Sequence, residues 1–210
     1  MQSSTLSRAT VGRLPLYLQF VRTVQGETVS AATIARSLGL GEVQVRKDLA
    51  SICPAGMPKV GYPSARLRAD LEKVLGMKRI VPAAIVGAGR LGRALMEYDG
   101  FKDYGLEIVA AFDINGTDEI HEGVPILKME EMRRWCLLHE VRLGILAVPA
   151  AAAQQAAEIM ADSGVTAILN FAPCPVHVPE HVTVMQENIA LSLAYLKMIA
   201  CTPGQIKEED

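Results

Sequence analysis

One stretch of the chain, residues 83–95, constrains the fold more than any other. A short apolar run there ends in three glycines, Gly87, Gly89 and Gly92, and an amphipathic helical pattern follows them. Glycines in G-x-G-x-x-G spacing between a strand and a helix are typical of a dinucleotide-binding unit. They allow a tight turn, the close approach of a pyrophosphate, and close packing of the helix on the strand. We therefore expect phosphates at the N-terminus of this helix, where the helix dipole favours negative charge.

An acidic residue follows the glycines at a distance that favours NAD(H). Residues 106–113 form a second apolar run, which ends at Asp113, 21 residues after Gly92. An acid about 20 residues beyond the last glycine can accept a hydrogen bond from the ribose 2′-hydroxyl. Residues 114–117 contain no Arg or Lys to hold a 2′-phosphate, so we expect NAD(H) rather than NADP(H). The alternative is a nucleotide-free doubly wound sheet with a chance glycine turn.

The second half of the chain continues as alternating apolar runs and helical patterns. Continuous apolar runs are typical of buried parallel strands, and ligands bind beyond the carboxyl ends of such strands. We therefore expect Val148 and Pro149 beside the nicotinamide. Residues 188–201 form a helical pattern that is apolar on too many sides for one sheet, and we expect it to pack against a partner subunit. Strands are expected at 143–148, 165–171 and 182–185, and helices at 130–139 and 150–163.

The two parts of the chain differ in charge. Residues 1–80 contain 12 Lys or Arg and 5 Asp or Glu, whereas residues 81–210 contain 9 and 18. A basic first third joined to an acidic remainder indicates a nucleic-acid-binding module fused to a second domain. An uneven distribution of solvated surface charge is the alternative.

The basic part has the pattern of a helix-turn-helix. After an arm of residues 1–12, helices are expected at 13–24, with Pro15 in the first turn, at 31–38 and at 42–52. Ser30 is the expected N-cap of the second helix, and Gly39 ends it. Two helices joined by a glycine turn match a helix-turn-helix, whose last helix enters the major groove by its N-terminal half. We expect that helix to turn one set of residues inward, Val45, Leu49 and Ile52, and another set outward, Gln44, Lys47 and Asp48.

Several residues of this part carry chemistry that suits DNA. Gln44 can pair with adenine, and Arg46 or Lys47 with guanine or phosphate. Residues 53–62, rich in Pro and Gly, are predicted to form a wing with Lys59 near its tip, able to reach phosphates or the minor groove. The alternatives are a plain linker for this stretch and a packing or dimerisation module for the three helices.

Composition excludes several other classes of protein. No apolar run approaches the ~20 residues that span a bilayer, and the polar N-terminus resembles no signal peptide. We expect a cytoplasmic protein without a metal site, because its scattered cysteines predict reduced thiols rather than disulfides or a zinc site. We interpret Cys53, beside the last helix of the helix-turn-helix, as a small filler residue. The cysteines are Cys53, Cys136, Cys174 and Cys201.

Together the motifs resemble the Rex family of redox-sensing transcriptional repressors along nearly the whole chain. The motifs that carry the resemblance are Val45-Arg46-Lys47-Asp48-Leu49, Val60-Gly61-Tyr62, residues 85–92, Tyr98-Asp99-Gly100-Phe101, Phe112-Asp113 and Asn170-Phe171-Ala172-Pro173. The resemblance implies an α/β protein with an N-terminal winged helix-turn-helix domain and a C-terminal Rossmann-like domain. It also implies a homodimer with swapped terminal helices, which binds AT-rich palindromic operators and is released from DNA by NADH.

The resemblance assigns site residues by position. The expected DNA-binding residues are Gln44, Arg46, Lys47, Lys59, Gly61 and Tyr62. The expected NAD(H)-binding residues are Gly87, Ala88, Gly89, Arg90, Leu91, Gly92, Asp113, Val148 and Pro149, with Tyr98 near the nicotinamide as part of the sensor.

This chain departs from the family pattern at the wing and at the sensor. The wing has Met57-Pro58-Lys59 in place of the family's basic, Gly-rich sequence, and residues 50–54 also differ. The family's sensor Tyr pairs with an Asp or an Arg, and the corresponding positions here are Ala190 and Gln19. Leu191 replaces the adjacent aromatic residue. We expect dinucleotide binding to persist and the discrimination between NADH and NAD⁺ to be altered.

The sequence therefore predicts a transcriptional repressor that couples the NADH/NAD⁺ state to operator binding, and not an enzyme. The expected domains are residues 1–76, 77–187 and 188–210. One alternative is a small NAD-dependent oxidoreductase with an N-terminal helical appendage, which would need a general acid or base beside the nicotinamide. The candidates for that role are His177 and His181 first, then His121, His139, Tyr98 and Lys197. A second alternative is a nucleotide-dependent scaffold that has lost DNA binding.

Overall fold

The computed structural model describes residues 6–116 and 119–201, and the chain forms two compact units. The N-terminal unit comprises residues 1–80 together with 103–105. The C-terminal unit comprises residues 81–102 and 106–210. The domain limits expected from the sequence differ slightly from the limits of these two units, and they remain a prediction.

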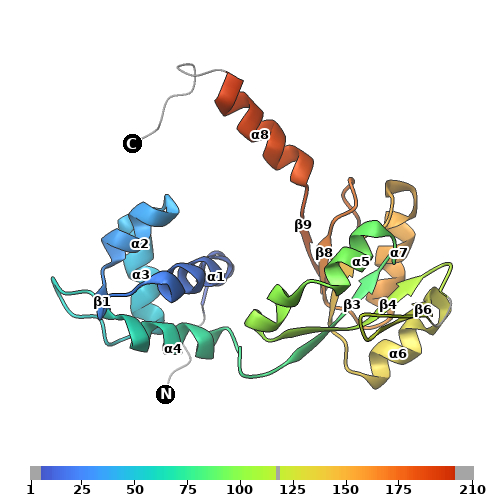
Figure 1. The fold of residues 1–210 in the computed structure, drawn as a ribbon, viewed down its shortest axis with the longest axis horizontal. Helices are drawn as coiled ribbons and strands as arrows, with labels where there is room; N and C mark the ends of the chain where they lie inside the picture. Colours follow the sequence, from blue (N-terminus) through green and yellow to red (C-terminus); the bar gives the residue numbers. More distant parts are fainter. Residues whose placement is uncertain (1–5, 117–118, 202–210) are drawn as a thin grey trace. The chain divides into compact units, whose positions relative to one another are not determined.

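The N-terminal unit is built from four helices and a two-stranded ribbon (Figure 1). Strand β1 pairs antiparallel with β2. The elements are α1 (Arg8–Thr23), β1 (Thr28–Val29), α2 (Ala31–Leu38), α3 (Glu42–Ile52), β2 (Tyr62–Pro63) and α4 (Ser64–Val74).

Local capping explains where two of these helices lie. The Ser30 side chain accepts a hydrogen bond from the Thr33 amide, and Gly39 ends α2 in the left-handed conformation, so both predictions are confirmed. The predicted range of α3 is confirmed as well. The predicted arm was wrong for residues 8–12, because Ser7 caps α1 at the Thr10 amide and the helix begins five residues earlier than expected. Pro15 consequently lies inside α1 and not in its first turn.

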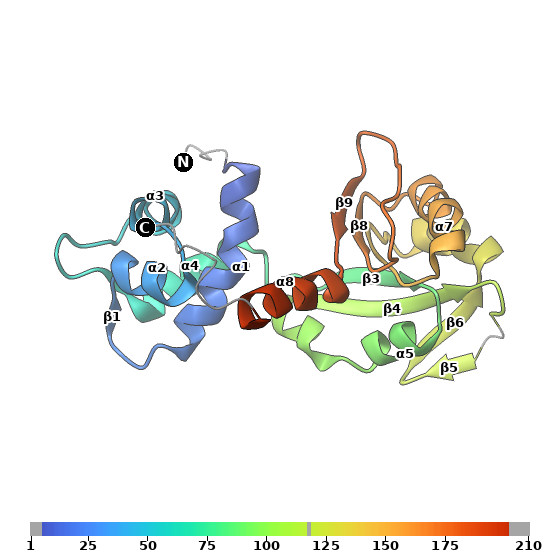
Figure 2. The ribbon, with the colours of Figure 1, turned by 90° about the horizontal axis from the view of Figure 1, so that it is seen from above.

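The C-terminal unit contains a seven-stranded sheet in the order β5-β6-β4-β3-β7-β8-β9 among the described residues (Figures 1 and 2). All neighbouring strands run parallel except β5 and β6. The strands are β3 (Val81–Val86), β4 (Leu106–Asp113), β5 (Glu119–His121), β6 (Val124–Lys128), β7 (Leu143–Leu146), β8 (Ala167–Asn170) and β9 (Thr183–Gln186). The helices are α5 (Arg90–Met96), α6 (Met132–Leu138), α7 (Ala150–Asp162) and α8 (Ile189–Cys201), with 3-10 turns η1 (Asp99–Tyr104) and η2 (Met129–Glu131).

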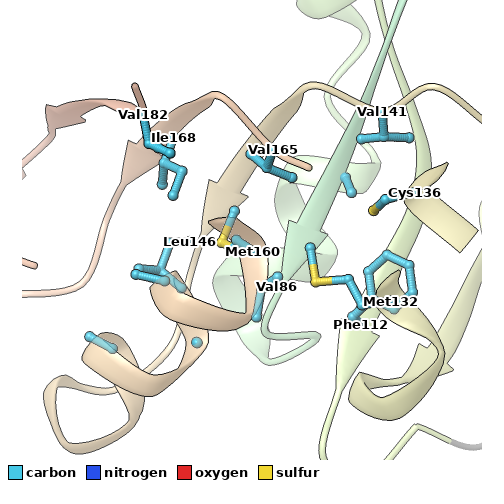
Figure 3. Close-up of a cluster of buried hydrophobic side chains, with 14 of the residues drawn as sticks. Val86, Phe112, Met132, Cys136, Val141, Leu146, Met160, Val165, Ile168 and Val182 are labelled. Carbon is cyan, nitrogen blue, oxygen red and sulfur yellow. The ribbon is translucent and has the colours of Figure 1, made fainter. Parts of the chain in front are cut away.

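Successive residues of the central strands point to opposite faces of this sheet. On one face, Val86 and Phe112 pack with Met160 of α7 in the larger apolar cluster (Figure 3). On the other face, Ile85 packs in a smaller cluster with Met96 of α5. The sheet is therefore covered on both sides, as the continuous apolar runs predicted.

The hairpin β5–β6 was missed at the level of sequence. Residues 119–121 are Glu-Ile-His, and two of them are exposed, so no apolar run marks the strand. Its place at the edge of the sheet explains this composition, because one side of an edge strand faces solvent.

Helix α8 buries none of its residues within the described chain. Its exposed large apolar side chains are Ile189, Leu191, Leu193, Tyr195, Leu196, Met198 and Ile199. None of the helices in the described part of the chain is both long and apolar enough to cross a bilayer.

The glycine turn between β3 and α5 depends on two positions that exclude a side chain. Gly87 adopts a φ of 102°, and a Cβ there would lie 2.8 Å from the carbonyl carbon of Ala147. A Cβ on Gly92 would overlap the carbonyl oxygen of Gly87. Helix α5 thus approaches the turn as closely as a helix can, which fixes the position of the turn at the end of β3.

We predict that Gly92→Ala destabilises the C-terminal unit. The methyl group meets backbone, which cannot move as a flexible side chain can, so the loss should lie near the upper end of the ~1–3 kcal/mol typical of overpacking. Gly12→Ala is the matched control, because it too is helical and has open space around the new Cβ. That control should gain ~0.5–1 kcal/mol. Urea unfolding measures the stability of both variants, and equal stabilities of Gly92→Ala and Gly12→Ala would contradict the prediction.

Candidate functional site

The glycine turn opens into a cavity of about 340 Å³ at the carboxyl ends of β3, β4 and β7. This is where ligands bind in open parallel sheets. The lining residues come from the glycine turn, the loop after β4 and the first turns of α7. They are Val86, Gly87, Gly89, Phe112, Asp113, Ile114, Asn115, Met129, Ala147, Val148, Pro149, Ala152, Gln155, Ala156 and Ile159.

Asp113 joins the glycine turn to the end of β4. One carboxylate oxygen, Oδ2, accepts a hydrogen bond of 2.9 Å from the Ala88 amide. The other, Oδ1, accepts one of 2.9 Å from the Asn115 amide. Each oxygen has a second lone pair that a ribose hydroxyl can use. The acid therefore supports the turn and keeps acceptor capacity on both oxygens.

The cavity suits an adenine dinucleotide in three respects. Apart from Gly89 and its two chain neighbours, no atom of the described residues lies within 4 Å of where a Cβ of Gly89 would stand, so the backbone is open to a phosphate there. No Arg or Lys is among the described residues that line the cavity, which agrees with a ribose without a 2′-phosphate. Apolar side chains such as Ile114 and Ile159 provide surfaces for a flat base.

The expected cofactor residues are only partly brought together. Five of them line the cavity, namely Gly87, Gly89, Asp113, Val148 and Pro149. Ala88 contributes its amide to Asp113, whereas Arg90, Leu91 and Gly92 belong to α5 and are not part of the lining.

Tyr98 lies apart from the cavity. It is 59% exposed, its ring meets the Phe101 ring edge-on with centroids 5.1 Å apart, and it lines a second cavity of about 280 Å³. Sequence reasoning missed Met129 and Gln155 in the first cavity. The signal for Gln155 was the helical pattern directly after Pro149, because the start of a helix that follows a strand end faces the same edge of the sheet.

The outer face of α3 is a candidate DNA-binding surface. Arg46 and Lys47 are exposed, and Arg46 pairs with Glu42 one turn earlier. Val43, 64% exposed, was missed, although an apolar side chain there suits the methyl group of thymine.

The wing, residues 53–62, is a tight turn with Lys59 at its tip. The Met57 carbonyl accepts hydrogen bonds from the amides of Val60, at 3.2 Å, and Gly61, at 2.9 Å. Lys59 adopts a φ of 63°, a left-handed conformation that costs a residue with a side chain ~1–2 kcal/mol. Lys59 and Arg46 both line a groove of about 750 Å³ between the wing and α3. Both cations therefore face one hollow, which suits a polyanion.

Two residues expected at the DNA surface also have structural positions. The Tyr62 side chain is 6% exposed and belongs to the core of the N-terminal unit, and burial raises its pKa. Gly61 has a φ of 102°, and a Cβ there would lie 2.9 Å from the Val29 carbonyl carbon. Gly61 and Tyr62 thus help to place the wing, and both also line the groove between the wing and α3.

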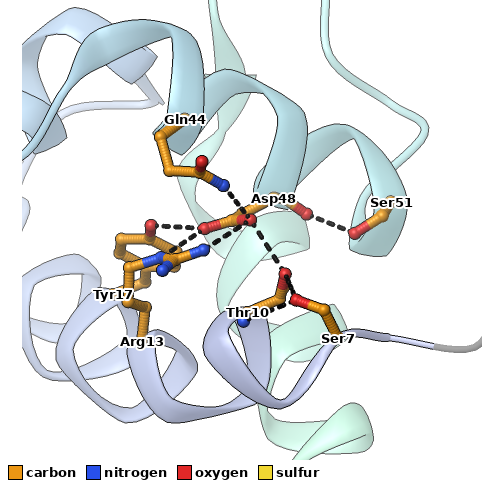
Figure 4. A network of polar contacts seen from close by, with 7 residues as sticks. All are labelled: Ser7, Thr10, Arg13, Tyr17, Gln44, Asp48 and Ser51. Atoms are coloured by element: carbon orange, nitrogen blue, oxygen red, sulfur yellow. Dashed lines mark hydrogen bonds and ion pairs between the residues drawn. The ribbon is translucent and has the colours of Figure 1, made fainter.

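Asp48 was predicted on the outer face of α3, and this prediction was wrong, because the residue is 3% exposed. Three side chains of helix α1 donate hydrogen bonds to it (Figure 4). Oδ1 accepts from the Thr10 hydroxyl at 3.1 Å and from Nη2 of Arg13 at 3.1 Å, and Oδ2 from Nε of Arg13 at 2.7 Å and the Tyr17 hydroxyl at 2.8 Å. From α3 itself, Nε2 of Gln44 donates to Oδ1 at 2.9 Å.

These donors keep Asp48 ionised. Burial by itself raises the pKa of a carboxyl group, but the hydrogen bonds from Arg13, Tyr17, Gln44 and Thr10 outweigh it and hold the pKa of Asp48 below its ordinary value. Burial and the hydrogen bond to Asp48 raise the pKa of Tyr17 to about 12, so its hydroxyl stays a donor.

None of the candidates for acid–base catalysis is among the residues described as lining the first cavity. His121 contacts Glu97 at 2.8 Å and Arg93 at 3.3 Å, and His139 stacks on Trp135. The backbone of His177 pairs with the Gln154 side chain. Within the described part of the chain, no group of three or more His, Cys, Asp or Glu could hold a metal ion.

Two protein-family models match the chain. One, described as a putative DNA-binding protein N-terminus, matches residues 5–50. The other, described as a CoA binding domain, matches residues 78–174. The first covers α1, α2 and most of α3, and the second covers the cavity and the strands β3 to β8.

Several proteins named redox-sensing transcriptional repressor Rex are similar to the chain over most of its length. The one from Pelotomaculum thermopropionicum is 39% identical over 202 residues, which cover 93% of this chain and 94% of that protein. The one from Treponema denticola is 39% identical over 198 residues, 91% of this chain and 94% of that protein.

Solved structures of RSP, a Rex-family repressor, have the same fold. Its complex with β-NAD⁺ and operator DNA gives a TM-score of 0.84 at 27% identity, covering 94% of this chain and 93% of that one. Its complex with β-NADH gives 0.82 at 26% identity, covering 94% and 95%.

We predict that the N-terminal unit loses stability in acid through Asp48. The folded-state pKa lies below the unfolded value, so this contribution is complete above about pH 4 and is lost as the pH falls further, through the folded pKa. Asp48→Asn should remove that pH dependence and cost about 3 kcal/mol, because Arg13 keeps a charge without its anionic partner. Urea unfolding between neutral and acidic pH measures both effects. An unchanged acid slope in the variant would contradict the prediction.

Proposed function

The chain belongs to the Rex family of redox-sensing transcriptional repressors, and we propose that it represses transcription under the control of NAD(H). The N-terminal unit binds operator DNA, and the cavity at the glycine turn binds the dinucleotide. The observation that carries the proposal is the combination in one chain of a basic helix-turn-helix and a Gly/Asp nucleotide cavity, with relatives that match both.

The protein is a regulator and not an enzyme. The relatives that match 91–93% of the chain are named as transcriptional repressors. The oxidoreductase alternative required an acid or base at the cavity, and the candidate histidines described above have other contacts. The scaffold alternative rested on the altered wing, and Lys59 and Arg46 still face one groove there.

Specific residues support each half of the proposed activity. Asp113 would accept hydrogen bonds from the ribose, and the backbone at Gly87 and Gly89 would face the pyrophosphate. Arg46 and Lys47 on α3 and Lys59 on the wing would contact DNA. The bound dinucleotide supplies the redox signal, through the oxidation state of its nicotinamide ring.

Coupling between the two halves requires a shift in populations. A dinucleotide can change operator affinity only if it binds one arrangement of the DNA-binding domains better than another. To shift the protein from 99% DNA-bound to 99% released, the dinucleotide must bind the two arrangements with free energies that differ by about 5.5 kcal/mol. In a dimer, the two arrangements can differ in the spacing between the two recognition helices. Only one spacing matches the operator, because the DNA fixes the distance between its half-sites.

We propose that the protein is a cytoplasmic homodimer and that its operator is an AT-rich palindrome. Helix α8 supports the dimer, because seven large apolar side chains on it are exposed within one chain, and water would otherwise surround them. A twofold symmetric dimer reads a palindrome naturally.

The redox sensor itself has changed in this chain. Ala190 and Gln19 stand where the family has charged partners for the sensor Tyr, so Tyr98 would have to act without them. We propose that the protein still binds the dinucleotide, and that NADH and NAD⁺ differ less in their effects on operator binding.

One prediction of the proposed function concerns the release of operator DNA. Fluorescence anisotropy of a labelled AT-rich palindrome with the purified protein should show binding, and NADH should release the DNA more than NAD⁺ does. Leu191→Phe together with Ala190→Asp, the family's residue classes at these positions, should enlarge the difference between the effects of the two cofactors.

Lys47→Ala should weaken binding to all duplexes alike and reduce the salt dependence of binding. A lack of binding to any duplex at low salt would overturn the repressor function.

A further prediction concerns the role of α8 as the dimer interface. Leu193→Asp should convert the dimer to monomers in sedimentation velocity, because a charge would then lie in the apolar interface. Leu138→Asp is the matched control, since that leucine on α6 is 73% exposed against 61% for Leu193. A dimer that survives Leu193→Asp would argue against α8 as the interface.

A further inference from the structure

The side chain of Gln44 is held by Asp48 in one orientation (Figure 4). Gln44 and Asp48 stand one turn apart on α3, with the glutamine exposed and the aspartate buried. A carboxylate can only accept hydrogen bonds, so the amide nitrogen of Gln44 must be the atom that faces Asp48. The chemistry of the pair therefore fixes which end of the amide points inward.

The fixed orientation leaves a defined pair of groups for a ligand. The amide nitrogen has two hydrogens, and one of them is used by Asp48 at 2.9 Å. The carbonyl oxygen and the second N–H remain. An acceptor beside a donor is the complement of adenine, which presents the N6 donor and the N7 acceptor in the major groove. Guanine presents two acceptors, N7 and O6, and would meet the carbonyl oxygen of Gln44 with one of them.

A glutamine that is free to rotate would select adenine less strictly. Rotation of its amide by half a turn exchanges oxygen and nitrogen, so that both hydrogens can face the acceptors of guanine. We infer that Asp48 is a specificity-determining residue of this repressor, which acts through Gln44 by holding its amide in the orientation that selects adenine. The inference rests on the proposed DNA-binding function.

The donors from α1 make this constraint strong. Thr10, Arg13 and Tyr17 come from 31 to 38 residues earlier in the sequence and hold both oxygens of Asp48 in place. Arg13 is bidentate, which fixes the plane of the carboxylate. Asp48 therefore cannot turn with Gln44 when a base approaches.

The test compares base preferences and not affinity alone. The probe is an AT-rich palindromic duplex recovered from a random pool by the wild-type protein, together with duplexes that carry each single base-pair change in both half-sites. Loss of discrimination in Gln44→Ala identifies the base pair that Gln44 reads. At that position the wild type should prefer adenine over guanine by roughly tenfold to a hundredfold.

Asp48→Asn should change the preference at that position and at no other. A carboxamide has one oxygen, which Arg13 claims because it can only donate. The amide nitrogen of the new side chain then faces Gln44, whose oxygen must turn inward to accept. Two hydrogens are left for the base, so the adenine preference should fall at least tenfold or shift to guanine.

Thr10→Val is the matched control, since it removes one donor to Asp48 and leaves the contact with Gln44. It should lower stability and keep the wild-type base preference. If Asp48→Asn does not fold, Gln44→Glu tests the premise of the inference, that position 44 reads the base through one acceptor and one donor. A carboxylate at position 44 can only accept, so adenine should lose its advantage and cytosine, with its N4 donor, should gain.

The outcomes separate the two proposals. A changed preference at the Gln44 position alone supports the inference. A uniform loss of affinity across all duplexes with the wild-type preference intact overturns it, because Asp48 would then only stabilise the unit. Base preferences that Gln44→Ala leaves untouched overturn it as well. A wild-type protein that recovers no duplex from the pool overturns the proposed function and the inference together.

Discussion

The buried carboxylate of Asp48 is the interaction on which the DNA-binding surface depends. It collects donors from α1 and α3 and so fixes the orientation of the recognition helix within the N-terminal unit. A buried charge without such donors would cost several kcal/mol, so the network has to form as a whole. The same carboxylate also sets the orientation of Gln44. Stability and base recognition are thereby linked in one residue.

The C-terminal unit depends on a different constraint, the absence of side chains. Helix α5 lies so close to the end of β3 that only glycine fits at position 92. The turn at Gly87 requires a positive φ and contacts the chain after β7. Asp113 then holds the turn from the end of β4. The glycine turn at this cavity therefore depends on backbone geometry, which explains why a short sequence motif predicts it.

The sensor is the part of the chain where we expect a departure from the family pattern. Tyr98 keeps its place in the sequence but is exposed, and the positions of its expected charged partners hold Ala190 and Gln19. The cavity residues, by contrast, follow the expected pattern. We propose that different residues carry the binding of the dinucleotide and the reading of its redox state, and that only the second has lost its charged groups.

Features that depend on neighbouring residues could be predicted from the sequence. The limits of α3, the cap at Ser30 and the end of α2 at Gly39 follow from local hydrogen bonds and dihedral preferences. Strand β4 was predicted from its apolar run with its observed limits. The start of α1 was misplaced because one capping residue, Ser7, determines it and no apolar pattern marks it.

The sequence by itself determined the glycine turn, the acid at the end of β4 and the helix-turn-helix, because each depends on residues a few positions apart or on the fixed geometry of a strand. Only the tertiary structure decided the burial of Asp48, the structural position of Tyr62 and the separation of Tyr98 from the cavity. Helical periodicity places Asp48 at the border of the inner face, where it could face either way. The packing of α1, whose donors lie 31 to 38 residues away, turns that border position into the centre of a network.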